Sequence, residues 1–283
     1  MTTLDRVTFF NFARNAPFGG RLTQEQVDGL NLILDYWNAH LPDGDVRWLA
    51  YILATVFHET GARMSPVREA FAPNDVEARK RLSNREYAAP DPSTGHSYYG
   101  RGYVQITHIE NYERLGKILG LDLVRNPDLA LDNTIALRIL FEGMMEGLSG
   151  KGDFTKYALS DFFNQTIDDP VNARKIINGK DKAGLVASYH LHFLNSINAA
   201  RDAAAKGERP PEVSKDAAKA DGPKTLLTDK TSIGAMVLGS GGFVGSMIGA
   251  ISNPWALAAF VALAIGAFLV ITGRVELKYK KGA

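Results

Sequence analysis

The sequence predicts a mainly α-helical domain, followed by a polar linker and an apolar C-terminal tail. Apolar residues recur at helical spacing in several stretches, and residues that favour helix caps precede them. Strand patterns are weak, and the best of them lies around "YYGRGYVQIT" at 98–107. The tail differs from the rest because no Asp, Glu, Lys or Arg occurs between residues 231 and 273.

Two helices are expected early in the chain. Thr23 and Gln26 have the spacing of a capping box, and a helix follows over 27–40. Asp45 is placed to cap a second helix over 46–59. The apolar stripe of this second helix consists of Leu49, Ile52, Leu53 and Val56. Four more helices are expected: 109–119 ended by Gly120, 133–148 capped by Asp132, 171–178, and 184–205.

Length and composition exclude several classes of function. The 283 residues allow one large domain and an additional segment. Because 32 Lys and Arg face 31 Asp and Glu, the net charge is only +1, and we expect no nucleic-acid partner. The chain has no cysteine, which excludes disulfides and thiolate chemistry. No His, Asp and Glu set has metal-ligand spacing and no glycine-rich phosphate loop occurs, so we expect no metal and no cofactor.

We divide the chain into a domain at 1–203, a flexible polar linker at 204–230 and a tail at 231–283. The first 20 residues contain Asp5 and no long apolar run, so we expect no signal peptide.

The tail resembles a membrane-spanning segment. Residues 255–272 are about long enough for one span, which takes roughly 17–25 residues, and 232–252 is nearly as long. Asn253-Pro254 between them indicates a turn. We therefore expect a transmembrane helix or a helical hairpin that attaches the protein to a membrane through 232–273. Glycines recur at four-residue spacing, at Gly241, Gly245 and Gly249, and allow helices to approach closely. Self-association through the tail is therefore possible. Basic residues flank both ends of the tail, so its orientation in the membrane is open. The alternative to a membrane span is an apolar helix packed in a second domain.

Two carboxylates are candidates for acid–base chemistry. Glu59 lies seven residues after Ile52, at the edge of the apolar stripe, where a carboxylate costs free energy unless it is paired, hydrogen-bonded or protonated. It is either a helix-end carboxylate half in solvent or a general acid. Glu69 follows an irregular loop that contains Gly61 and Pro66. Such a loop can turn back, so that the carboxyls of Glu59 and Glu69 face each other across a cleft.

A second motif surrounds Arg101. Gly100 and Gly102 permit close backbone approach to a ligand. The flanking tyrosines offer flat faces with polar tips, which suit sugar rings, or else they pack in the core around a tight turn. They are Tyr98, Tyr99 and Tyr103. Thr107 either begins a capping box with Glu110 or holds a water molecule.

Taken in order, these segments resemble the chitinase-like domain of glycoside hydrolase family 19. The segments that carry the resemblance are "FHETG", "YYGRGYVQITHIENY", "NPDLALD" and "ARKIING". The stretch "GGRLTQEQVDGLNLIL" resembles the opening of the bacterial and bacteriophage endolysin branch of this family. The resemblance spans roughly residues 15–200 and implies a lysozyme-like, two-lobed helical domain with a substrate cleft.

The resemblance also implies roles for individual residues. Glu59 matches the general acid, Glu69 the general base, and Thr107 a residue that helps to hold the attacking water. The residues that match the lining of the sugar cleft are Tyr99, Arg101, Gln105, Asn111, Arg174 and Asn178. For Arg174 and Asn178 the alternative is a helix C-cap, with Asn178-Gly179 in left-handed geometry. We group His58 with the binding residues, as an orienting or packing side chain.

By this resemblance the protein hydrolyses β-1,4 bonds between N-acetylated amino sugars with inversion, and the two carboxyls should lie roughly 6.5–9.5 Å apart. We favour peptidoglycan as the substrate, and hence a bacteriolytic enzyme held at a host inner membrane or in a virion. Chitin is the alternative substrate. Two non-enzymatic alternatives are a sugar-binding module without turnover and a membrane-permeabilising protein with a non-catalytic wall-binding domain.

Overall fold

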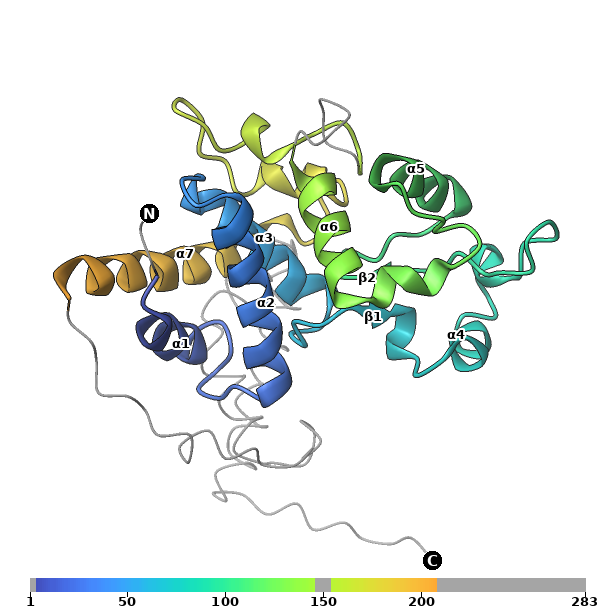
Figure 1. Ribbon diagram of the computed structural model, residues 1–283, viewed down its shortest axis with the longest axis horizontal. Helices are drawn as coiled ribbons and strands as arrows, with labels where there is room; N and C mark the ends of the chain where they lie inside the picture. Colours follow the sequence, from blue (N-terminus) through green and yellow to red (C-terminus); the bar gives the residue numbers. More distant parts are fainter. Residues whose placement is uncertain (1–3, 146–153, 208–283) are drawn as a thin grey trace, which may run out of the picture. The chain divides into compact units, whose positions relative to one another are not determined.

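The computed structural model describes residues 4–145 and 154–207 (Figure 1). These residues contain seven α-helices and one two-stranded sheet. The helices are α1 (Arg6–Asn15), α2 (Gln24–His40), α3 (Val46–Glu59), α4 (Asp75–Arg81), α5 (Ile109–Leu119), α6 (Asn133–Met144) and α7 (Ala183–Lys206). The mainly α class predicted from the sequence is confirmed for these residues.

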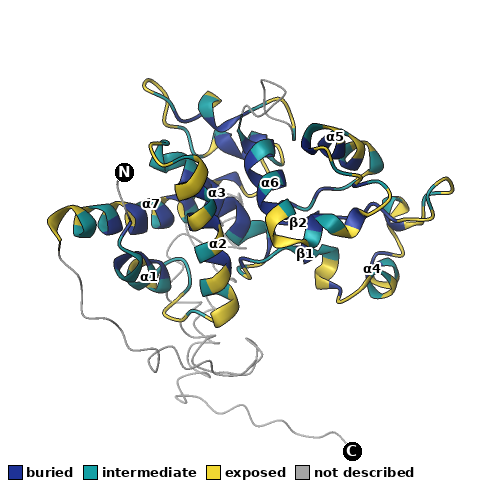
Figure 2. Ribbon diagram, viewed as in Figure 1, coloured by how far each residue is buried: buried dark blue, intermediate teal, exposed yellow. Residues whose placement is uncertain are grey.

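Helix α3 is enclosed by other helices and places Glu59 at its C-terminal end. It packs against α2, α6 and α7, and α7 also packs against α1. Every residue from 49 to 56 is therefore buried, and not only the predicted apolar stripe. Figure 2 shows this burial of α3 and the exposed outer sides of α2 and α4. A helix held on several sides is a rigid support for a side chain at its end.

Local capping chemistry accounts for most of the predicted helix ends. The capping box of Thr23 and Gln26 is present at the start of α2. The carboxylate of Asp45 accepts from the N–H of Arg47 at the start of α3. Helix α5 ends at Gly120, whose φ of 67° is left-handed.

Three elements differ from the prediction. The helix expected over 171–178 is a 3₁₀ turn, η5 (Asn172–Ile176). Helices α1 and α4 were not predicted, although Asp5 and Asn74 cap them through their side chains. Helix α6 starts after Asp132 as predicted and ends at Met144, and residues 146–148 of its expected range lie outside the described residues.

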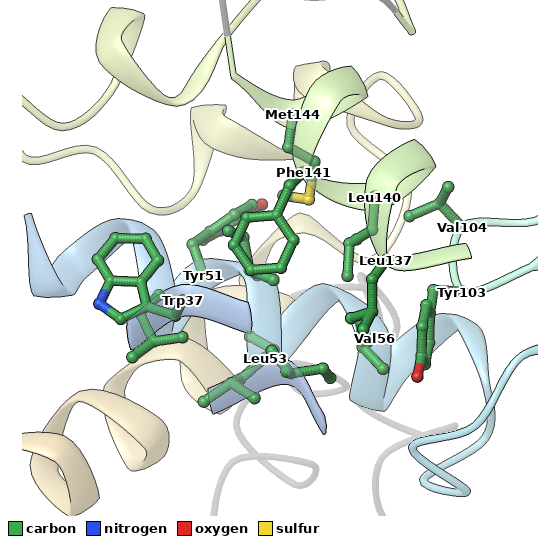
Figure 3. Packing of buried hydrophobic residues seen from close by; sticks show 14 of the residues in the cluster. Trp37, Tyr51, Leu53, Val56, Tyr103, Val104, Leu137, Leu140, Phe141 and Met144 are labelled. Atoms are coloured by element: carbon green, nitrogen blue, oxygen red, sulfur yellow. The ribbon is translucent and has the colours of Figure 1, made fainter. Parts of the chain in front are cut away.

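The buried apolar side chains form a large cluster and a small one. Figure 3 shows part of the large cluster, which contains Tyr103 and Val104 together with Val56 of α3 and Leu137 of α6. The small cluster consists of Ala72, Ala78, Leu82, Ala88 and Tyr99. The predicted two lobes and the cleft between them stay predictions.

The short sheet joins two distant segments. Strand β1 (Val67–Arg68) pairs antiparallel with β2 (Arg101–Gly102), so that Val67 opposes Gly102 and Arg68 opposes Arg101. The strand predicted around 98–107 is thus present over two residues, and it brings the segment before Glu69 against the glycine-rich motif.

Within the described ranges, no helix is long and apolar enough to cross a membrane. The segments predicted to do so, 232–252 and 255–272, lie outside those ranges, as does most of the linker at 204–230.

Candidate active site

Glu59 is paired with a buried arginine. The Nη1 of Arg174 donates to Oε1 of Glu59 at 2.6 Å, although the two residues are 115 positions apart in the chain. The side chain of Glu59 is 16% exposed, and that of Arg174 is buried. This pairing explains how a carboxylate can end a buried helix face. It also leaves Oε2 of Glu59 without a hydrogen-bond partner among the described residues.

Arg174 is itself held in place by backbone. Its Nε donates to the carbonyl oxygen of Asp181 at 2.9 Å, and its own carbonyl accepts from the N–H of Asn178 at 2.9 Å. Asn178 is exposed, and Gly179 after it takes a left-handed φ of 55°. The backbone of Asn178 therefore supports the Arg174 turn, and the predicted Asn-Gly turn has its left-handed residue at the glycine.

His58 lies beside the same pair. Burial lowers the pKa of its imidazole, against the opposing effect of the negative charge of Glu59. The ring lies near Tyr189 of α7, with centroids 6.4 Å apart. A neutral, half-buried imidazole next to an aromatic ring agrees with the predicted orienting or packing role.

The loop after Glu59 is anchored to α2. Ala62 and Met64 both have left-handed φ values, 65° and 61°. The side chain of Gln26 donates to the carbonyl of Ala62 at 2.9 Å. Gly29 lets the loop pack directly on α2, because a Cβ there would lie 1.9 Å from the carbonyl oxygen of Met64. The loop thus turns sharply and leads the chain to β1 and Glu69.

Glu69 receives hydrogen bonds at both carboxylate oxygens. Tyr87 donates from Oη to Oε1 at 2.6 Å, and the N–H of Gly100 donates to Oε2 at 2.8 Å. The backbone N–H of Glu69 also donates to the carbonyl of Gly100 at 2.8 Å. Because a backbone N–H can only donate, Oε2 must be an acceptor in this arrangement. Glu69 is thereby fixed against the glycine-rich motif, with Oε2 held as an acceptor.

Thr107 does not form the predicted capping box. Helix α5 begins at Ile109, and His108, with a φ of 72°, is its cap residue without a side-chain cap bond. The Thr107 hydroxyl donates instead to the carbonyl of Gln105 at 2.9 Å. Its only hydrogen is therefore used, and towards a water molecule Thr107 can act only as an acceptor.

Gln105 and Asn111 hold the backbone around Thr107. Gln105 donates from Nε2 to the carbonyls of Val67 and Gly102, at 2.9 and 3.0 Å. Asn111 donates from Nδ2 to the carbonyl of Thr107 at 2.6 Å. Both side chains are partly exposed. Their predicted contact with sugar therefore stays a prediction.

The predicted sugar contacts of Tyr99 and Arg101 need correction, because both side chains are in the interior. Tyr99 is 0% and Arg101 1% exposed. The guanidinium of Arg101 lies 3.8 Å from the centroid of the Tyr99 ring, and the Tyr99 hydroxyl donates to Asp75 at 2.7 Å. Tyr98 and Tyr103 are buried as well, so the core-packed alternative holds for all three tyrosines.

Arg101 joins several segments. Its guanidinium donates to Asp128 at 2.8 Å, to Asp75 at 3.2 Å and to the carbonyl of Ser97 at 2.9 Å. Further bonds reach the Tyr99 carbonyl and the Tyr112 hydroxyl. Since a guanidinium offers five donors in a planar fork, an ammonium cannot replace it here.

We expect Arg101→Lys to lower the free energy of unfolding by about 3 kcal/mol, because acceptors around a buried cation lose their donors. Urea denaturation would measure the loss, with Arg125→Lys as the control because the Arg125 side chain is 84% exposed. A variant that unfolds like wild type but binds substrate more weakly would show that Arg101 contacts sugar after all.

Tyr87 is a site residue that the sequence analysis missed. Burial and the hydrogen bond to Glu69 raise the pKa of its hydroxyl to about 12, so at neutral pH it is a donor. Its ring lies edge-on to His108, with centroids 5.3 Å apart. The only hint in the sequence is a tyrosine in a polar, exposed stretch, which does not identify its partner 18 residues away.

We expect Tyr87→Phe to lower kcat about tenfold and leave KM unchanged, because a hydrogen bond to a charged group contributes roughly 1.5–3 kcal/mol and this one orients Glu69. Steady-state kinetics and a melting curve would test this. A raised KM with unchanged kcat would instead assign Tyr87 to sugar binding.

The structure thus gathers the predicted residues into two groups. Glu59, His58 and Arg174 form one, and Glu69 forms the other with Gln105, Thr107 and Asn111. The predicted separation of the two carboxyls stays a prediction. Within the described ranges, no group of three or more His, Asp and Glu side chains is arranged to hold a metal ion.

Comparison with known proteins bears on this part of the chain. Residues 43–170 match the family described as "Chitinase class I" (Glyco_hydro_19), just under half of the chain. A basic endochitinase of Vitis vinifera is 38% identical over 101 residues, 34% of this chain and 32% of that protein. Chitinase 11 of Oryza sativa subsp. japonica is 40% identical over 93 residues, 32% of this chain and 33% of that protein. This chain therefore spans about a third of the length of the curated relatives that it matches.

Among solved structures, chitinase C from Streptomyces griseus HUT6037 aligns with a TM-score of 0.40 and 22% identity, over 69% of this chain and 92% of that one.

Proposed function

We propose, from the family match over residues 43–170, that this protein is an inverting glycoside hydrolase. Its proposed substrate is a polymer of β-1,4-linked N-acetylated amino sugars, with chitin as the preferred case. The observation that carries the proposal is the different setting of two glutamates inside the matched region. One oxygen of Glu59 is bound by Arg174, while both oxygens of Glu69 accept hydrogen bonds.

In the proposed reaction Glu59 is the general acid. Because Arg174 donates to Oε1, a proton carried by Glu59 resides on Oε2. This proton passes to the glycosidic oxygen as the bond between that oxygen and the anomeric carbon breaks.

Glu69 is the proposed general base. A water molecule gives one hydrogen bond to Glu69 and one to the acceptor lone pairs of Thr107, whose own hydrogen is used at Gln105. Both hydrogens of the water are then directed away from the sugar, and an oxygen lone pair can point at the anomeric carbon. Glu69 takes the proton as the water oxygen bonds to that carbon from the opposite face, which inverts its configuration.

Chitin is preferred to peptidoglycan because the named relatives are chitinases. Peptidoglycan is the second candidate, on one observation: the segment at 19–34, "GGRLTQEQVDGLNLIL", resembles the endolysin branch and lies outside the matched region. Digestion of purified chitin and purified bacterial cell wall by the full chain, with mass spectrometry of the products, would decide between them. Cleavage of cell wall alone would reverse our preference, and cleavage of neither would end the proposal.

We also propose that the tail at 232–273 tethers the enzyme to a membrane. The support is its length without Asp, Glu, Lys or Arg. The full chain should float with lipid vesicles in a density gradient, and a chain without residues 229–283 should not. Equal flotation of both would contradict the tether, whichever polymer is cleaved.

A further inference from the structure

Phe71 is an exposed aromatic residue two positions after Glu69. It is 44% exposed. Among the large apolar side chains of the described residues, Phe12 is the only other exposed aromatic one. Single exposed apolar residues are common on protein surfaces, so exposure alone means little. What distinguishes Phe71 is that its backbone is strained and is held in place by a neighbouring side chain.

The backbone at Phe71 is strained and clamped. Ala70 and Phe71 have left-handed φ values of 55° and 51°, a backbone conformation that is strained for residues with a Cβ. Arg81, in the last turn of α4, donates from Nη1 to the carbonyl oxygens of both residues, at 3.0 and 3.1 Å. One side chain thus holds the two carbonyls of the strained turn that carries Phe71.

The ring reaches across to the segment that follows Glu59. A Cβ at Gly61, two residues after Glu59, would lie 2.9 Å from Cζ of Phe71. The guanidinium carbon of Arg63 lies 4.5 Å from the centroid of the ring. Phe71 therefore links the two carboxylate-bearing segments, with its backbone beside Glu69 and its ring beside the turn after Glu59.

This arrangement suits an amino sugar. The ring hydrogens of a β-linked pyranose form an apolar face that packs on an aromatic ring, while its hydroxyl and acetamido groups need hydrogen-bond partners. The guanidinium of the exposed Arg63 lies over one face of the Phe71 ring, so the flat apolar surface for a sugar is the opposite face, and Arg63 offers donors. A sugar packed here would lie beside the two segments that carry the proposed catalytic residues.

We propose that Phe71 and Arg63 form a sugar-binding platform that holds one N-acetylated amino sugar beside the bond to be cleaved. This inference rests on the proposed hydrolase function and adds two binding residues that the sequence analysis did not include.

The test compares variants of the full chain on the N-acetylglucosamine hexamer. Phe71→Ala and Phe71→Leu should raise KM about tenfold with kcat within about twofold of wild type, because the sugar loses an aromatic face that it contacts equally in the ground state and the transition state. Phe71→Trp should keep KM near wild type. Phe12→Ala is the matched control, since Phe12 is 49% exposed on α1.

Binding of the hexamer to the Glu59→Gln protein, with and without Phe71→Ala, gives a readout that needs no turnover, and we expect about tenfold weaker binding in the double variant. Wild-type cleavage combined with unchanged KM and unchanged binding in the Phe71 variants would overturn the platform alone. No cleavage or binding of the hexamer by wild type would overturn the proposed chitin activity and the platform together. Equal losses in Phe71→Leu and Phe12→Ala would show a nonspecific effect and also reject the platform.

Discussion

Glu59→Gln is expected to lower kcat by about 10²–10⁴-fold, the contribution typical of general acid catalysis. Glutamine has nearly the same shape and keeps an oxygen that can accept from Arg174, so the protein should fold normally. What it lacks is a proton that can pass to the glycosidic oxygen. Initial rates on the N-acetylglucosamine hexamer would measure the loss.

The matched control for this variant is Glu113→Gln, an exposed position on α5 that should keep wild-type turnover. Aryl glycosides with a good leaving group provide a second check, because their leaving oxygen needs no proton. Glu59→Gln should recover most of its rate on them. Wild-type turnover of the hexamer by Glu59→Gln would remove Glu59 from the mechanism.

Glu69→Ala is expected to reduce kcat by a similar 10²–10⁴-fold, because the attacking water loses the group that takes its proton. A good leaving group should not restore the rate of this variant, since the step that it lacks is removal of a proton from the attacking water. Azide, which needs no deprotonation, should restore part of the rate and form the α-glycosyl azide from a β-linked substrate. Proton NMR of the products would identify that configuration.

The wild-type enzyme should release the α-anomer first from the same substrate. Release of the β-anomer would show retention of configuration and contradict the assignment of Glu69 as a base that activates water. Rescue of Glu69→Ala by leaving groups, and of Glu59→Gln by azide, would mean that the two roles are reversed.

Agreement between sequence and structure is closest where the physics is local. The capping box of Thr23 and Gln26, the Asp45 cap and the Gly120 stop all involve atoms within four residues of one another, and all three are present. The same reasoning overlooked α1 and α4, where Asp5 and Asn74 do cap helices but the apolar pattern is weak.

Errors arose where one local pattern permits two outcomes. Thr107 and Glu110 have the spacing of a capping box, yet the hydroxyl bonds to Gln105, and His108, with a positive φ, is the cap residue. Around Arg101 the glycines and tyrosines suited either a sugar site or a packed turn. The outcome depended on Asp75 and Asp128, which pair with the guanidinium from elsewhere in the chain.

Sequence patterns alone therefore supplied five of the seven described helices, the two glutamates and the family to which residues 43–170 are similar. The folded chain was needed to find the partners of those glutamates, Arg174 and Tyr87, and to reveal the strained turn at Phe71. Caps and helical periodicity are set by neighbours along the chain, whereas the burial and pairing of a side chain depend on segments that meet only after folding. Arg174 illustrates the difference, because its contact with Glu59 joins positions 115 residues apart.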